Sequence, residues 1–147
     1  MSSHVNPEVR PTPAVAAAVV HQGRVLMVQR RNPPNAGMLA LPGGRVEPGE
    51  PLLEAALREL HEETGIIADS ERVLTAIDQF QHDDQGCLLS HFVIVVVTCR
   101  WVGGAAVAGD DANQIHWLDA TQVSSEASLC ASARRIATNL LADTKRR

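Results

Sequence analysis

The stretch GRVEPGEPLLEAALRELHEETGI, residues 44–66, decides how the rest of this chain is interpreted. Its glutamates include Glu50, Glu59, Glu62 and Glu63, and it begins with Gly44 after a second glycine. A proline is well tolerated in the first turn of a helix, and a glycine is a common C-terminal stop. We therefore predict a helix that opens at Glu50-Pro51 and closes at Gly65.

The predicted helix has two different faces. Residues three and four apart are neighbours on a helix, so one face carries apolar and small side chains for the core: Leu53, Ala56, Leu57, Leu60 and Thr64. Glu59, Glu62 and Glu63 share another face. Crowded carboxylates raise one another's pKa and weaken the helix, and a bound divalent cation removes that conflict. The alternative is a solvated acidic face, which is the common meaning of glutamates on a helix.

The spacing of the fixed residues resembles the Nudix box: a glycine, five residues, a glutamate, seven residues, then Arg-Glu-aliphatic-any-Glu-Glu-any-Gly-aliphatic. This chain fills every specified position, with Gly44, Glu50, Arg58, Glu59, Leu60, Glu62, Glu63, Gly65 and Ile66. The preceding Leu41-Pro42-Gly43 is similar to the family's usual approach to the box. The stretch from Ser90 to Trp117 also resembles short bacterial members described as ADP-ribose pyrophosphatase-like.

The resemblance implies a hydrolase that cleaves a diphosphate linked to another moiety, with Mg²⁺ or Mn²⁺ as cofactor. Glu59 and Glu63 would be metal ligands, joined by Glu62 and by the carbonyl of Gly44. Metals neutralise phosphate oxygens, lower the pKa of bound water and align attack with departure. Arg58 would hold a glutamate in place; alternatively, it forms a surface ion pair with Glu54 or Glu62.

The general base differs across the family, so Glu62 and Glu63 are both catalytic candidates together with Arg58 and Glu59. Many relatives place an acidic residue shortly before a Trp-containing strand, but here Gln114 stands where Glu is common. Asp110 and Asp111 are the fallback candidates for a metal ligand or base, and a solvated turn explains them equally well. Glu50 either binds metal through water or fixes the loop, and Gly65 has a structural role.

Candidate substrate contacts lie outside the box. Phe80 is a candidate stacking partner for a nucleobase or an ordinary core residue. His82 in the following loop is a candidate substrate contact, and a solvated loop explains it equally well. Arg30 and Arg31 leave a strand beside a proline-containing loop and are candidates to meet phosphate or ribose, although paired surface arginines are common. The span 67–100 lacks the proline of the ADP-ribose subgroup, and the chain has no tyrosine, which the diadenosine polyphosphate subgroup carries.

Composition limits the remaining function classes. The 147 residues fit one domain, and a net charge of −4 argues against binding a nucleic-acid polymer. The three cysteines form no CxxC pair, which favours reduced thiols over a disulfide frame or a zinc site. The longest apolar run is too short to span a membrane and the N-terminus is not a signal peptide, so we expect a soluble cytoplasmic protein. A homodimer is compatible with the long strand at 88–98.

Strand patterns flank the predicted helix. A hairpin is expected at 14–20 and 25–30, with further strands at 39–41, 73–80, 88–98 and 115–118. Residues 101–108 are expected to be a glycine- and alanine-rich connection, and 125–141 a C-terminal helix. The pattern predicts an α/β (α+β) layered domain. The resemblance implies the Nudix fold, a mixed β-sheet sandwiched between helices, with a flexible lead at 1–12 and one domain at 13–143.

The resemblance leaves three candidate functions. The first is hydrolysis of the pyrophosphate linkage in a nucleoside diphosphate linked to a sugar or similar group, which is a small-molecule substrate. The second is pyrophosphohydrolysis of nucleoside triphosphates, including oxidised ones. The third is a non-catalytic domain that senses a nucleotide, although such domains often lose box glutamates and none is lost here.

Overall fold

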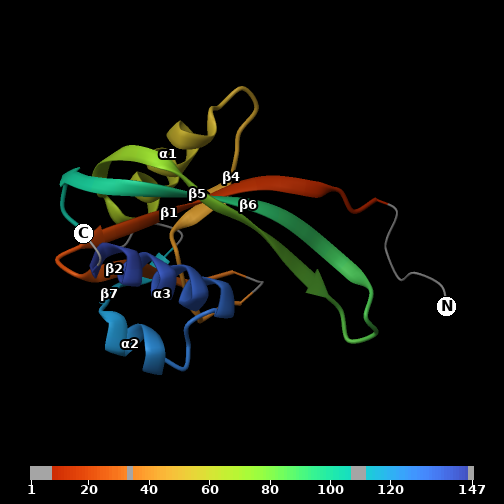
Figure 1. Ribbon diagram of the computed structural model, residues 1–147. Helices are drawn as coiled ribbons and strands as arrows, with labels where there is room; N and C mark the ends of the chain where they lie inside the picture. The colour runs from red at the N-terminus through yellow and green to blue at the C-terminus, as the bar shows by residue number, and fades with distance from the viewer. Residues whose placement is uncertain (1–7, 33–34, 107–111, 146–147) are drawn as a thin grey trace.

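The computed structural model describes residues 8–32, 35–106 and 112–145, which form one mixed sheet covered by helices (Figure 1). Its strands and helices follow in chain order: β1 Pro11–His21, β2 Arg24–Arg30, β3 Leu39–Ala40, β4 Gly43–Arg45, α1 Leu52–Thr64, β5 Ile67–His82, β6 Leu88–Gly103, β7 Ala112–Leu118, α2 Ala120–Ser125 and α3 Ala131–Lys145. The predicted α+β class with a sheet between helices is confirmed.

The sheet is mixed because β1 runs parallel to β6 and antiparallel to its other neighbours. The order is β3-β2-β1-β6-β5, with β4 pairing β1 and β7 pairing β2. The first half of β1 pairs with β4, and its end pairs with β2. β1 therefore separates from β2 along its first half. The short β4 pairs with β1 there and places Gly44, the first residue of the box, at the sheet.

Two apolar cores lie on opposite faces of the sheet. Alternate residues of β1 separate cleanly: Val15, Ala17 and Val19 pack with α1, and Ala16 and Ala18 pack with the C-terminal helices. This alternation follows from the two-residue period of a strand. Figure 1 shows α1 on one side of the sheet and α2 and α3 on the other. Helix α1, which carries the box, is thus held by a core separate from that of α3.

The predicted bounds of the box helix are confirmed. Pro51 is the N-cap in an extended conformation, and Gly65 ends the helix with φ 74° in the left-handed region, donating its N–H to the carbonyl of His61 at 2.8 Å. Thr64 Oγ1 also donates to the carbonyl of Leu60 at 2.6 Å. One predicted core residue was wrong: Leu53 is 37% exposed, because Ala55 and Ala56 take the buried positions of that turn.

The prediction of a single C-terminal helix at 125–141 was wrong. The structure has two helices, α2 and α3, joined by residues 126–130. Asp119 starts α2 with a capping box, in which its carboxylate accepts from the N–H of Gln122 and Gln122 Oε1 accepts from the N–H of Asp119, both at 2.9 Å. Arg134 of α3 donates to carbonyl oxygens of Val123 and Glu126, which fixes the corner.

β5 and β6 extend furthest beyond their predicted bounds. β5 begins at Ile67 and not at residue 73, and β6 continues through Trp101 to Gly103, a stretch predicted as a connection. Their pairing shifts register at four places, and no residue of β5 is buried. Irregular, half-exposed strands of this kind lack the clean alternation that marks a strand in a sequence.

The start of the domain differs by two residues from the sequence estimate, since β1 already begins at Pro11. Within the described ranges, none of the helices combines the length and apolarity that a membrane span requires.

Candidate functional site

Gly44 and Glu59 meet at the centre of the site. A Cβ atom added to Gly44 would lie 2.5 Å from Glu59 Oε1 and 2.6 Å from Oε2, so only glycine leaves room for this carboxylate. The Glu59 residue is 9% exposed and comes from α1, whereas Gly44 lies on β4. The missing side chain therefore makes the space in which Glu59 lies against the backbone.

The three glutamates predicted to share a face of α1 do not share an environment. Glu59 and Glu63, one turn apart, are both buried, and Glu63 is 6% exposed. The side chain of Glu62 is 51% exposed and accepts a hydrogen bond from Arg58 Nη1 at 3.2 Å. In the part of the chain that the structure describes, no three acidic, histidine or cysteine side chains gather as a metal-binding group.

These observations fit a divalent cation through a smaller donor set than the sequence predicts. Two buried carboxylates beside a glycine backbone supply hard oxygen donors, which Mg²⁺ and Mn²⁺ prefer. Glu59, Glu63 and the carbonyl of Gly44 are the residues that could hold the ion. Glu62 faces solvent and Arg58 in this arrangement.

Arg58 organises the acidic groups of the site. Its Nη1 donates to Glu59 Oε1 at 2.9 Å, and its Nε and Nη2 form a bidentate pair with Glu50 at 2.6 and 3.0 Å. Nη2 also donates to the carbonyl of Arg45 at 3.0 Å. Hydrogen bonding to Glu50 raises the pKa of Arg58 above its ordinary value. The alternative role as a surface ion pair with Glu54 or Glu62 accounts for none of these contacts and only for the additional bond to Glu62.

Glu50 fixes the loop before the helix. Its Oε1 accepts from the N–H of Glu47 at 3.1 Å in addition to the two bonds from Arg58. The hydrogen bond from Arg58 lowers the pKa of Glu50. Of the two predicted roles for Glu50, the contacts support the one that fixes the loop.

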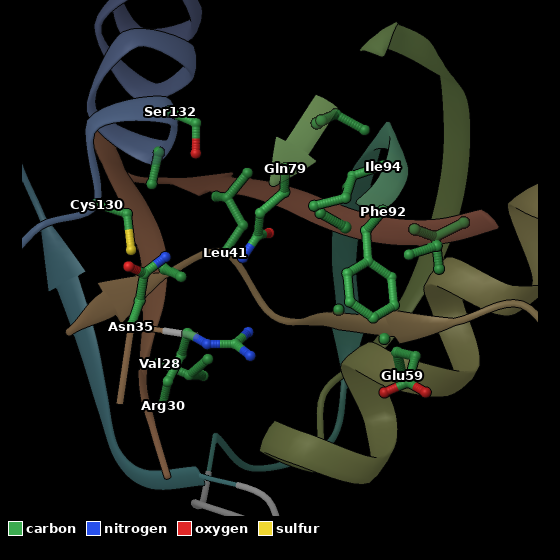
Figure 2. A pocket seen from close by; sticks show the side chains of 18 of the residues that line it. Val28, Arg30, Asn35, Leu41, Glu59, Gln79, Phe92, Ile94, Cys130 and Ser132 are labelled. Carbon is green, nitrogen blue, oxygen red and sulfur yellow. The ribbon is translucent and has the colours of Figure 1, made fainter. Parts of the chain in front are cut away.

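A cavity of about 510 Å³ opens from the carboxylates across the sheet toward α3 (Figure 2). Glu59, Glu63, Gly44 and Arg45 line one end, and Cys130, Ser132, Ala133 and Ile136 line the other. Its floor is apolar sheet: Ala14, Ala16, Ile77, Ile94 and Val96. Burial raises the pKa of the Cys130 thiol, so this side chain is neutral. A volume of this size lies within the usual range for small-molecule sites.

The predicted cationic contacts reach this cavity, and the predicted aromatic one does not. Arg30 and Arg31 both line it. Phe80 is 53% exposed and does not line it. Neither does His82, which is the last residue of β5 and not part of the predicted loop. Phe92, which the sequence did not single out, takes the position expected of Phe80.

Phe92 extends from β6 into the cavity, as Figure 2 shows, and Gln79 projects from the neighbouring strand. The guanidinium carbon of Arg45 lies 5.6 Å from the Phe92 ring centroid. Strand parity is the signal that could have found Phe92, since it shares the face of Ile94 and Val96. The fallback candidates Asp110 and Asp111 lie outside the described residues.

Relatives with this architecture carry names from nucleotide chemistry. An ADP-ribose pyrophosphatase of Methanocaldococcus jannaschii is 36% identical over 109 residues, which is 74% of this chain and 62% of that protein. The chain thus spans about three-fifths of the length of this relative.

Solved structures agree in fold. The crystal structure of a MutT NUDIX hydrolase from Burkholderia pseudomallei has a TM-score of 0.75 and 28% identity, covering 88% of this chain and 97% of that one. A bifunctional NMN adenylyltransferase/ADP ribose pyrophosphatase from Francisella tularensis has a TM-score of 0.68 and 25% identity, covering 94% of this chain and 42% of that one.

The family model of the NUDIX domain matches residues 10–140, which includes both cores except Leu141, the Gly44–Glu59 contact and the cavity. With a match over most of its length and a box complete at every specified position, this chain belongs to the NUDIX domain family.

Proposed function

We propose that this chain is a metal-dependent pyrophosphohydrolase that cleaves the diphosphate of a nucleoside diphosphate linked to a sugar, of the ADP-ribose type. The observation that carries the proposal is the buried Glu59 carboxylate, which lies against Gly44, is held by Arg58 and lines a cavity large enough for a nucleotide. The name of the Methanocaldococcus jannaschii relative supports this substrate class.

The metal and the residues of the site have different roles in the proposed reaction. Bound Mg²⁺ or Mn²⁺ supplies neutralisation of the phosphate oxygens and a lowered pKa of water. Arg58 orients Glu59 and joins it to Glu50, which keeps the acidic groups in one arrangement before substrate arrives. Arg30, Arg31 and Arg45 line the cavity and offer positive charge to the phosphates.

A carboxylate would accept the proton of the attacking water, and Glu62 is our first candidate for this general base. Its side chain is 51% exposed, so solvent reaches it, and its bond to Arg58 at 3.2 Å keeps it near Glu59. Glu63 is the second candidate; Asp110 and Asp111 stay proposals for a ligand or base. The cytoplasmic location, the homodimer and the lack of a nucleic-acid substrate also stay predictions.

A substrate panel with Mg²⁺ tests the proposal. We expect ADP-ribose or a nucleotide sugar to give nucleoside monophosphate and sugar phosphate, with no turnover when the metal is removed by EDTA. Glu63→Gln serves as the inactive control. Hydrolysis of nucleoside triphosphates alone would remove this substrate class, and no turnover of any nucleotide would favour a non-catalytic domain.

A second function is favoured by a specific likeness. A CTP pyrophosphohydrolase of Escherichia coli is 44% identical over 55 residues, which is 37% of this chain and 41% of that protein. Its name supports cleavage of nucleoside triphosphates to monophosphate and pyrophosphate. Release of inorganic pyrophosphate from a triphosphate panel is the expected sign, and its absence with every triphosphate would end this alternative.

A further inference from the structure

Phe92 and Gln79 form a matched pair on the cavity side of the sheet. They are direct partners in the antiparallel pairing of β6 with β5, and both line the cavity. Figure 2 shows the ring and the amide side chain pointing from neighbouring strands into the same hollow that holds Glu59. Side chains of directly opposed residues lie within about 5 Å at Cβ, so one ligand group can contact both.

The Phe92 ring is partly buried, lines the cavity and already receives a planar group. Arg45 already lies over the ring, with 5.6 Å from its guanidinium carbon to the centroid. Phe92 is the one aromatic residue among those that line the cavity in the described part of the chain. A nucleobase is a planar group of the same kind, and base–aromatic stacking does not depend on which base is present.

Gln79 can determine the specificity for the nucleobase. Within the described ranges, no hydrogen bond engages its amide, which offers one donor and one acceptor side by side. Adenine presents N7 as an acceptor and its 6-amino group as a donor, and an amide side chain bonds both at once. Hypoxanthine presents two acceptors at the same edge, so the amide can satisfy only one of them.

We propose that Phe92 and Gln79 are the nucleobase site of this chain: the base stacks on Phe92, and the Gln79 amide bonds the 6-amino group and N7 of adenine. The inference rests on the proposed function, because the diphosphate is placed at Glu59 and Glu63. It adds what the box does not contain, namely a selection for adenine nucleotides.

Binding of the two halves of the proposed substrate, measured separately, distinguishes the base site from the phosphate site. AMP carries the base and ribose 5-phosphate does not, so calorimetric binding of both ligands is compared in the wild type, Phe92→Leu, Phe92→Tyr and Gln79→Met. We expect Phe92→Leu to weaken AMP binding about tenfold, which is within the range for loss of one stacked base, and to leave ribose 5-phosphate binding unchanged. Phe92→Tyr keeps the ring and should retain AMP binding.

The control is Phe80→Leu, a matched change on the opposite side of β5. Phe80 is exposed and does not line the cavity, so this variant should bind AMP as the wild type does. Melting curves confirm that each variant is folded. In the wild type AMP should bind more tightly than IMP, and Gln79→Met should remove that difference.

Three results would overturn the inference: equal losses of AMP and ribose 5-phosphate in Phe92→Leu, unchanged AMP binding in that variant, or equal affinity of the wild type for AMP and IMP. In turnover assays, Phe92→Leu should raise KM and leave kcat unchanged, because the base is remote from the bond that breaks. If AMP binds as predicted but ADP-ribose is not hydrolysed, the proposed reaction fails and the base site stands.

Discussion

The two ends of the cavity are built in different ways. The acidic end comes from 20 consecutive residues, 44–63, in which β4, one loop and α1 place Gly44, Glu50, Arg58 and Glu59 together. The other end combines β5, β6 and the start of α3, which are far apart in the chain. The acidic end is a short hydrogen-bonded unit with fixed spacing, whereas the opposite end depends on sheet register and can change residue by residue.

Glu63→Gln should have the largest effect and separates the roles of the two ends most clearly. The change keeps size and removes the charge of a buried carboxylate, so we expect kcat to fall on the order of 10³-fold. The melting temperature should change little, because the side chain faces the site and not an apolar core. Steady-state kinetics and thermal unfolding measure the two quantities. An unfolded variant would contradict this facing.

The adjacent glycines give a matched pair of variants. In Gly44→Ala the new methyl group meets the Glu59 carboxylate, the movable end of a side chain, so we expect a loss of at least about 10²-fold in activity with a folded protein. In Gly43→Ala the methyl group meets the backbone carbonyl of Val15, which cannot move away cheaply, so we expect lost stability. Activity assays and denaturant unfolding of both variants test this difference. Equal stability of the two would show that the sheet yields at Gly43.

Arg58→Lys tests how far the acidic end works as one unit. A lysine has no planar fork, so it cannot hold Glu50 in a bidentate pair while also bonding Glu59 and the Arg45 carbonyl. We expect activity to fall about 10- to 100-fold, as for other residues that orient metal ligands. Titration with Mn²⁺ should show a weaker apparent metal affinity. An unchanged metal dependence would mean that Glu59 keeps its position without Arg58.

The pH dependence of stability gives the smallest effect. Hydrogen bonding to Arg58 lowers the pKa of Glu50, so the folded chain binds fewer protons there than the unfolded chain. The stabilisation is therefore present above the unfolded pKa, about 4.3, and is lost as pH falls through the lower folded pKa. Glu50→Gln should melt below the wild type at pH 7, and the difference should narrow toward pH 3. A difference that is independent of pH would show that shape, not charge, holds the loop.

The sequence predicts the acidic end well because its interactions are local. Pro51 and Gly65 mark the ends of α1, and helical spacing places Glu59 and Glu63 one turn apart. It does not predict that Glu62 faces solvent while its neighbours are buried. That difference depends on where β4 lies against the helix, which is a tertiary contact.

The rest of the site was missed for two physical reasons. Phe80 and Phe92 are both phenylalanines in strands, so residue type does not distinguish them. Only the register of β5 with β6 decides which one faces the cavity. At the C-terminus, apolar spacing continues through Leu129 although the helix does not, because Arg134 and the capping box at Asp119 impose a corner. The pattern Asp119-x-x-Gln122 was visible in the sequence as a helix start.

The alternation of β5 has an evolutionary consequence. Gln79 lines the cavity, and Phe80 lies on the other face, one residue further on. A single-residue deletion before Gln79 would shift the strand by one position and turn Phe80 inward in its place, since a slip of one residue exchanges the two faces. The pairing with β6 already tolerates four such irregularities. At the proposed base site, a one-residue indel in β5 would therefore change the group that meets the base without altering the acidic end.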